Sequence, residues 1–226
     1  MHVNARPLVV CPLEHEARLL RAAGVHDVAD VRVIGCSADR VVSTMNALPD
    51  SPRLIILAGV AGALTTLHAP GSAVVISQVV DAATSTTWTP THCGDADVTV
   101  TSSSHIIHGA ERSACAAHTG AHVVDMESVS FARAMIARGF SWAIVRGISD
   151  GPTAEFQVDV TNWTRDNGHV RTGRVIRDLA MHPGSWRAIR RLARTTKKAM
   201  HNVAVSIERL IDDAKIERAK KSPDHP

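Results

Sequence analysis

Three carboxyl side chains lie where apolar segments of the sequence give way to helical or loop-like ones. Glu16 follows the apolar run at 8–11, Glu127 follows a short β-branched run, and Asp150 follows the run at 142–145. A single glutamate at a helix start favours the helix dipole, and a single aspartate after a strand caps a turn. Three in this order instead indicate one site, where carboxyl groups would serve general acid–base chemistry.

Apolar runs alternate with helical patterns along the first two thirds of the chain, and these elements must position the three carboxyl groups. The sequence predicts strands at 8–11, 31–34, 53–57, 73–80, 98–101, 123–124 and 142–145. It predicts helices at 14–23, 43–48, 110–118 and 127–138, a small-residue turn at 58–62 and a loop at 84–91. Strands that alternate with helices form a largely parallel or mixed sheet flanked by helices on both faces, with chemistry at the carboxyl ends of the strands.

The length of 226 residues suits a single sizeable α/β domain. We expect an α/β core at 1–165, a C-terminal helical extension at 166–219 and a disordered tail at 220–226. Hydrophobic residues make up 45% and charged residues 21% of the chain, which is typical of a soluble globular protein. Aromatic residues make up only 3%, so the core must be built from aliphatic side chains.

The apolar run at 8–11 is too short for the hydrophobic region of a signal peptide, and two glutamates follow it closely. No later run has the length of a membrane-spanning helix. We therefore expect a cytoplasmic protein. The four cysteines are scattered without a CxxC pattern, so we expect buried thiols rather than disulfides, and no metal site. They are Cys11, Cys36, Cys93 and Cys115.

Residues 185–200 form a basic segment with six cations and no acid. Trp186, Ile189, Leu192 and Ala193 recur at helical spacing, which predicts a basic amphipathic helix. Such a helix either packs its apolar stripe on the core of a soluble protein or docks on an anionic membrane surface. Nucleic-acid binding is disfavoured because aromatic residues are not interleaved with the cations.

Four short motifs make the sequence resemble a known superfamily. They are residues 13–16 (LEHE), 59–62 (GVAG), 125–127 (DME) and 148–150 (ISD). With these motifs the chain resembles the nucleoside phosphorylase/nucleosidase superfamily, which includes methylthioadenosine/S-adenosylhomocysteine nucleosidases and purine nucleoside phosphorylases. The resemblance implies the single-domain phosphorylase/hydrolase-like α/β fold and cleavage of the N-glycosidic bond of a purine ribonucleoside, with adenine as the expected base.

One branch of this superfamily, the hopanoid-associated phosphorylases, is the most similar. It shares the form VDMES at 124–128 and a tail that resembles residues 166–170 (DNGHV), followed by 178–179 and Pro183. The resemblance implies an adenosylated hopanoid lipid as the leading substrate, with small methylthioadenosine-like nucleosides second. It also implies a homodimer, and it favours peripheral contact of residues 185–200 with the inner face of the membrane.

The resemblance further assigns roles to individual residues. Asp150 would protonate N7 of the purine, oriented by Ser149, because a purine leaves poorly unless it is protonated while the sugar becomes oxocarbenium-like. Glu127 would accept hydrogen bonds from the 2′- and 3′-hydroxyls of the ribose, against which Met126 would pack its thioether. Glu16 would act as the base that activates water.

Residues 102–107 stand where the nucleosidases place their base-binding segment, in which an aromatic and an aliphatic residue sandwich adenine. Here Ile106 and Ile107 would form that pair. The same segment also reads as a simple connection between a strand and a helix. Gly59, in the glycine-rich motif, is a further candidate for substrate binding.

The sequence lacks a recognisable set of arginines for phosphate, with Arg40 and Arg146 as the candidates. Of the superfamily's glycine-rich loop after the second strand, only Gly35 remains. Hydrolysis with Glu16 as the base is therefore favoured, and phosphorolysis with phosphate as co-substrate is the alternative. A nucleoside-binding protein without turnover is the third reading, although binding alone needs no acid at position 150. We expect no resident cofactor.

Overall fold

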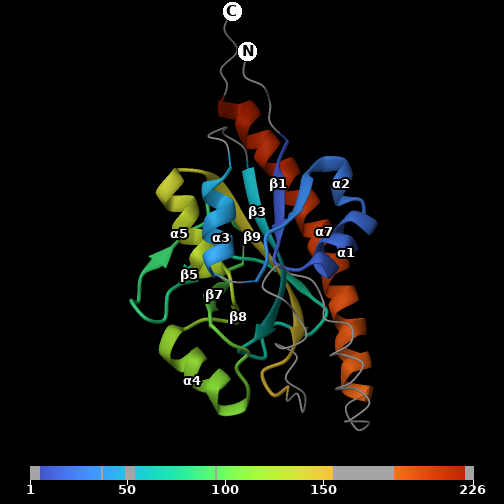
Figure 1. Cartoon of the computed structure of the whole chain (residues 1–226), viewed down its shortest axis with the longest axis vertical. Coiled ribbons are helices and arrows are strands. Elements are labelled where there is room, and N and C mark those ends of the chain that lie inside the picture. The colour runs from blue at the N-terminus through green and yellow to red at the C-terminus, as the bar shows by residue number, and fades with distance from the viewer. Residues whose placement is uncertain (1–5, 37, 49–53, 95, 155–185, 222–226) are drawn as a thin grey trace, which may run out of the picture.

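The computed structural model describes residues 6–36, 38–48, 54–94, 96–154 and 186–221 (Figure 1). The strands are β1 (Leu8–Cys11), β2 (Asp30–Val33), β3 (Leu54–Ala63), β4 (Ala73–Val75), β5 (Gln78–Val80), β6 (Thr87–Trp88), β7 (Thr99–Ser102), β8 (Val123–Asp125) and β9 (Ser141–Asp150). The helices are α1 (Glu14–Ala22), α2 (Val25–Val28), α3 (Ala38–Asn46), α4 (Gly109–Thr119), α5 (Ser128–Arg138) and α7 (Trp186–Lys221). The motifs noted at 166–170, 178–179 and Pro183 lie outside the described residues.

A mixed sheet of nine strands forms the centre of the molecule. Its order is β2-β1-β3-β8-β7-β5-β6, and β9 pairs with both β3 and β4. Parallel pairing dominates, in β1–β2, β1–β3, β3–β9, β5–β7 and β7–β8. The long strand β3 connects the two halves, because its first residues pair with β1 and its last two pair antiparallel with β8.

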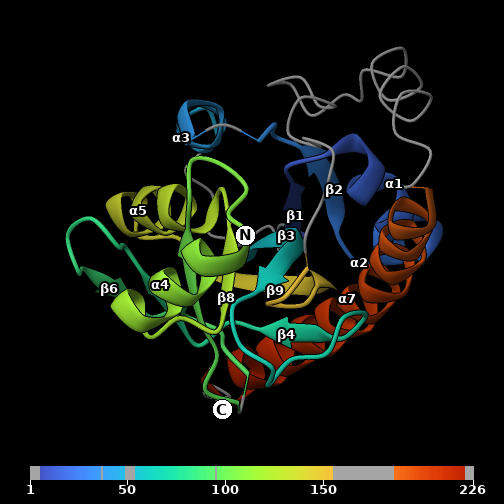
Figure 2. The same cartoon turned by 90° about the horizontal axis from the view of Figure 1, so that it is seen from below.

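Helices cover both faces of the sheet, as the alternation of elements predicts. Figures 1 and 2 show α3 and α5 together on one face, and α1, α2 and α7 on the other. The core under α5 includes Phe131, Met135 and Trp142, and the core under α7 includes Val203 and Ile207. The expected α/β fold, with a mixed and mostly parallel sheet between two helical layers, is confirmed.

The predicted turn at 58–62 is wrong, because these residues continue β3 to Ala63. Small residues there are explained by close packing: a Cβ atom on Gly62 would lie 3.0 Å from Arg112 Nη2. The predicted strand at 73–80 is two strands, since β4 pairs with β9 whereas β5 pairs with β7. The loop predicted at 84–91 contains β6, which pairs with β5.

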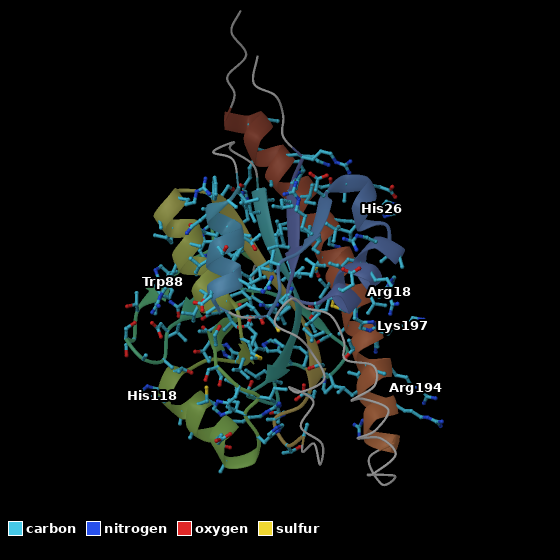
Figure 3. All side chains as sticks on the ribbon, viewed as in Figure 1. Arg18, His26, Trp88, His118, Arg194 and Lys197 are labelled. Carbon is cyan, nitrogen blue, oxygen red and sulfur yellow. The ribbon has the colours of Figure 1, made fainter. Side chains whose placement is uncertain are left out.

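Helix α7 confirms the helix predicted in the basic segment and continues to Lys221, so residues 220 and 221 are helical rather than part of the predicted tail. Its apolar stripe is buried on the sheet from Ala199 onward, whereas Ala193 is exposed. Figure 3 shows Arg194 on the outer side of α7, pointing away from the sheet. No helix among the described residues combines the length and apolarity needed to cross a membrane.

The cysteines are all free thiols, but they differ in burial. Cys11 is fully buried in β1, Cys36 and Cys115 are partly buried, and Cys93 is exposed. The expectation of buried thiols therefore holds for Cys11 and is wrong for Cys93. Within the described ranges, no three histidine, cysteine or acidic side chains are grouped so that they could hold a metal ion.

Candidate active site

A cavity of about 400 Å³ opens at the carboxyl ends of β1, β3 and β9, where they meet the starts of α1 and α5. Seven of the residues predicted from the sequence line it together: Glu16, Ile106, Ile107, Met126, Glu127, Ser149 and Asp150. Gly59 and Arg146 do not line it. Both lie directly behind its wall, in contact with the carboxyl groups that do.

Glu16 is held rigidly at the floor of this cavity. As the third residue of α1 it reaches back, and Oε2 accepts the Leu13 backbone N–H at 3.0 Å, which is the glutamate half of a capping box. Oε1 accepts the Val60 N–H of β3 at 2.8 Å. Burial raises the pKa of Glu16 to about 7, although these two hydrogen bonds and the nearby Arg146 lower it. A carboxyl group with this pKa exchanges protons near neutrality.

Asp125 fixes the entry to α5 and thereby positions Glu127. Its Oδ1 accepts the Ser102 hydroxyl at 2.7 Å and the backbone N–H groups of Glu127 and Ser128 at 3.2 and 3.1 Å. Its Oδ2 accepts a hydrogen bond from the Ser128 hydroxyl. The sequence did not single out this role, although an aspartate just before a helix is a recognised capping signal.

Arg146 is a fully buried cation among three carboxyl groups. Nη2 lies 2.5 Å from Asp125 Oδ2 and 3.5 Å from Glu127 Oε2, and Glu16 is the third acid that acts on it. Burial raises the pKa of Glu127 well above its ordinary value, and the charge of Arg146 opposes that shift. Within the described part of the chain, Arg146 Nε and Nη1 are buried without a hydrogen-bond partner.

Gly59 explains how these groups can meet. A Cβ atom at this position would lie 2.8 Å from Arg146 Nη1 and 2.9 Å from Glu16 Oε1, closer than side chains pack. The glycine therefore allows the guanidinium and the carboxylate to approach the backbone of β3. Its role in the structure is to admit the charged cluster, behind the cavity rather than in its wall.

Asp150 is the last residue of β9, and it lines the cavity together with Glu16. The Ser149 hydroxyl donates a hydrogen bond to its Oδ1, as the sequence predicts for an orienting serine. Its Oδ2 lies 2.5 Å from Nη2 of Arg112, which is buried on α4. No pattern in the sequence singles out Arg112, because it is one of many cations and its partner is 38 positions away. That contact exists only through the fold.

The predicted base-binding segment forms an apolar wall next to Asp150. Ile107 is buried against Leu64 and Val124, and Ile106 is partly exposed to the cavity. The segment also connects β7 to α4, as the alternative reading predicts, and its role in binding the base stays a prediction. Leu192 and Thr196 of α7 line the cavity as well, although the sequence placed Leu192 only in the apolar stripe of that helix.

Comparison with known proteins shows which solved structures share this fold. No family model matches the chain, and no curated protein matches it. The solved futalosine hydrolase of Helicobacter pylori is similar with a TM-score of 0.67 at 12% identity, over 94% of this chain and 100% of that one. The fold is that of the nucleosidases. The 5′-methylthioadenosine/S-adenosylhomocysteine nucleosidase of the same organism gives 0.62 at 13% identity, over 92% and 99% of the two chains.

A plant protein extends the likeness beyond bacteria. The 5′-methylthioadenosine nucleosidase of Arabidopsis thaliana gives a TM-score of 0.59 at 12% identity, over 92% of this chain and 96% of that one. The fold implied by the four sequence motifs is therefore confirmed over nearly the whole chain. Identities of 12% and 13% carry the fold alone, so the activity must be argued from the cavity.

Proposed function

We propose that the protein hydrolyses the N-glycosidic bond of a purine ribosyl compound and releases the base. The observation that carries this proposal is that Glu16, Glu127 and Asp150 line one cavity although they are far apart in the sequence. Cleavage of such a bond needs an acid at the base, a group that grips the sugar and a base for the attacking water. The cavity offers one carboxyl group for each task.

Asp150 is proposed as the acid that protonates N7 of the purine. Its side chain reaches the cavity but is largely shielded from solvent, and Ile106 and Ile107 provide an apolar wall for the flat ring. Ser149 holds Oδ1, which fixes the orientation of the carboxyl group. A proton delivered from Asp150 lets the bond between N9 and C1′ break with the electron pair remaining on the base.

Glu127 is proposed to accept the ribose hydroxyls. A buried carboxylate forms strong hydrogen bonds with hydroxyl groups that reach it from the cavity. The fixed start of α5, capped by Asp125, holds Glu127 in one place for this contact. Met126 lines the cavity next to it and offers an apolar surface to the sugar.

Glu16 is proposed as the base that takes a proton from water as the oxygen attacks C1′. Its pKa of about 7 suits this task, because it is ionised in a large part of the molecules near neutral pH and still binds a proton well. Arg146, directly behind the cavity wall, carries a positive charge that favours the ionised form of Glu16.

Phosphorolysis is the less favoured reaction. Arg146, the sequence candidate for phosphate, is already surrounded by Asp125, Glu127 and Glu16, and it does not line the cavity. Arg40 does not line the cavity either. A phosphate dianion would therefore meet a predominantly acidic wall, and repulsion between like charges opposes its binding. A neutral water molecule meets no such barrier.

The test is base release from a panel of purine ribosyl compounds, with and without phosphate, by wild type and Asp150→Asn. We expect phosphate-independent release by wild type and a loss of about 100-fold or more in the variant. Equal activity in the two proteins would remove Asp150 from the mechanism. Tight nucleoside binding without any turnover would instead support the binding-protein alternative.

Other features remain predictions that rest on the resemblance and on the sequence of 185–200. They are adenine as the base, an adenosylated hopanoid as the substrate, a homodimer and peripheral contact with the inner face of the membrane. The cations Arg190, Arg191, Arg194, Lys197 and Lys198 are exposed on α7, which is compatible with an anionic surface as partner. Co-sedimentation with anionic vesicles at increasing salt tests that contact, and salt-independent absence of binding would contradict it.

A further inference from the structure

Arg112 enters the cavity from α4 at the place where the purine would lie. Its side chain is 3% exposed, it lines the cavity, and its Nη2 lies 2.5 Å from Asp150 Oδ2. Gly62 lines the cavity beside it, and a Cβ atom there would approach Nη2 to 3.0 Å. Nη2 thus lies between the proposed acid and a glycine that leaves room for it.

The other nitrogens of Arg112 are anchored on three different segments. Nε donates to the carbonyl of Ile107 at 2.9 Å. Nη1 donates to the carbonyls of Ala63 and Gly151 at 3.2 and 2.7 Å. These bonds hold the plane of the guanidinium against the end of β3, the end of β9 and the segment that forms the apolar wall. The group cannot turn without breaking several buried hydrogen bonds.

Arg112 has at least one N–H donor more than it has acceptors among the described residues. A guanidinium has five N–H groups and no acceptor. Nε uses one and Nη1 uses both of its own on backbone carbonyls. Of the two on Nη2, at most one points at Asp150, which is the partner of this nitrogen among the described residues. At least one N–H of Nη2 therefore remains for a group in the cavity.

The chemical groups along the edge of the purine determine what this N–H of Arg112 would contact. N7 and the substituent on C6 lie side by side on the ring, so an acid at N7 has the C6 substituent next to it. In a 6-oxopurine this substituent is an acceptor, and arginine pairs well with the N7 and O6 acceptors together. In a 6-aminopurine it is an amino donor, which would face the N–H of Arg112.

We propose that Arg112 reads the C6 substituent and that the substrate is a 6-oxopurine ribosyl compound, with hypoxanthine or guanine as the base. This inference rests on the function proposed above and replaces the adenine, and with it the adenosylated hopanoid, expected from the resemblance. The 6-amino group of adenine brings N–H donors to this position and would leave the spare N–H of Arg112 unpaired, which is costly in a buried site. A 6-oxo oxygen instead satisfies the spare donor and strengthens the grip on the ring.

The first test uses the wild-type protein and bases that differ only at C6: hypoxanthine, unsubstituted purine and adenine. Calorimetry should give the affinity order hypoxanthine, purine, adenine, with about tenfold or more between the first and last, as one well-placed hydrogen-bond pair discriminates bases. Cleavage should follow the same order for inosine and adenosine, which share one sugar. Equal or tighter binding of adenine would overturn the proposal without any variant.

The second test replaces Arg112, the residue proposed to recognise the C6 substituent. Arg112→Gln retains hydrogen bonding but presents an acceptor as well as a donor, so the ratio of hypoxanthine to adenine affinity should fall to near one. The matched control is Arg133→Gln on α5, which removes a guanidinium from Asp81, and neither Arg133 nor Asp81 lines the cavity. That control should keep the wild-type ratio. A folded Arg112→Gln protein with an unchanged ratio would contradict the role of Arg112.

The two proposals fail in different ways. Cleavage of adenosine in preference to inosine would leave the proposed hydrolysis standing and remove the 6-oxopurine inference. Preferential binding of hypoxanthine without cleavage of any ribosyl compound would support Arg112 as the reader of the base and remove the hydrolysis. Thermal unfolding of each variant, measured in the same buffer, separates loss of recognition from loss of the fold.

Discussion

Arg146 Nη2 lies 2.5 Å from Asp125 Oδ2, and both side chains are buried. This ion pair joins the middle of β9 to the carboxyl end of β8. It therefore fixes the strand that leads to Asp150 against the turn that leads to Glu127. The same aspartate accepts the backbone N–H groups at the start of α5, so one carboxylate stabilises the sheet and positions the site.

Asp125→Asn should destabilise the protein strongly. The amide oxygen can still cap α5, but the charge opposite Arg146 is lost, and an uncompensated buried charge costs about 3–5 kcal/mol. We expect a value near the lower end because Glu127 stays 3.5 Å from the guanidinium. Urea unfolding measures the change. Arg133→Gln, which breaks a pair with a half-exposed arginine, should cost less than about 1 kcal/mol, and similar losses in both variants would contradict the argument.

Gly59→Ala should impair the site more than the fold. The added methyl group would contact Arg146 Nη1 and Glu16 Oε1 at 2.8 and 2.9 Å, so both side chains must shift. Overpacking of this kind costs about 1–3 kcal/mol. Displacement of a reacting group by about 1 Å can lower kcat/KM about 100-fold. Gly94→Ala is the control, because its Cβ would also be crowded, 3.1 Å from Val75 Cβ, but Gly94 does not line the cavity, and kcat/KM of Gly59→Ala at the control's level would contradict the prediction.

The elements and the three carboxyl groups were predictable because their signals are local. Each apolar run marks a buried strand, and Glu16, Glu127 and Asp150 stand directly after or at the end of one. Parallel strands bring their carboxyl ends to one edge, so residues far apart in the sequence were expected to meet. The motif at 59–62 was read as a turn because glycine and alanine are weak strand formers, whereas tertiary contacts decide this case.

The charged network could not be predicted, because its partners are distant in the sequence. Arg112 on α4 and Asp150 at the end of β9 meet only in the folded chain. No local pattern distinguishes this arginine from other arginines on helices. Arg146 was a candidate for phosphate binding, but its side chain is fully buried among carboxyl groups. A strand reverses the direction of its side chains at every residue, so one position decides between cavity and interior.

The activity should depend on pH through Glu16. If this carboxylate takes the proton of water, kcat/KM rises with pH through about 7 as the group ionises. Glu16→Gln should lower kcat/KM by about 100-fold or more and abolish this limb of the profile. The profile of Glu14→Gln is the control, because Glu14 lies two residues earlier and pairs with Arg21 at the surface. A limb near pH 7 that persists in Glu16→Gln would assign it to another group.

The same carboxyl group should make the fold less stable as pH rises. The pKa of Glu16 is about 7 in the folded protein against an ordinary value of 4.5, so the folded state binds more protons between these values. Stability then falls as pH increases through this window, and the shift corresponds to about 3 kcal/mol at saturation.

Glutamine at position 16 does not titrate and keeps an oxygen to accept a backbone N–H. The unfolding free energy of Glu16→Gln relative to wild type should therefore increase from about pH 5 to about pH 8. Urea unfolding across that range measures the difference, and a difference independent of pH would mean that Glu16 ionises as freely in the fold as in the unfolded chain.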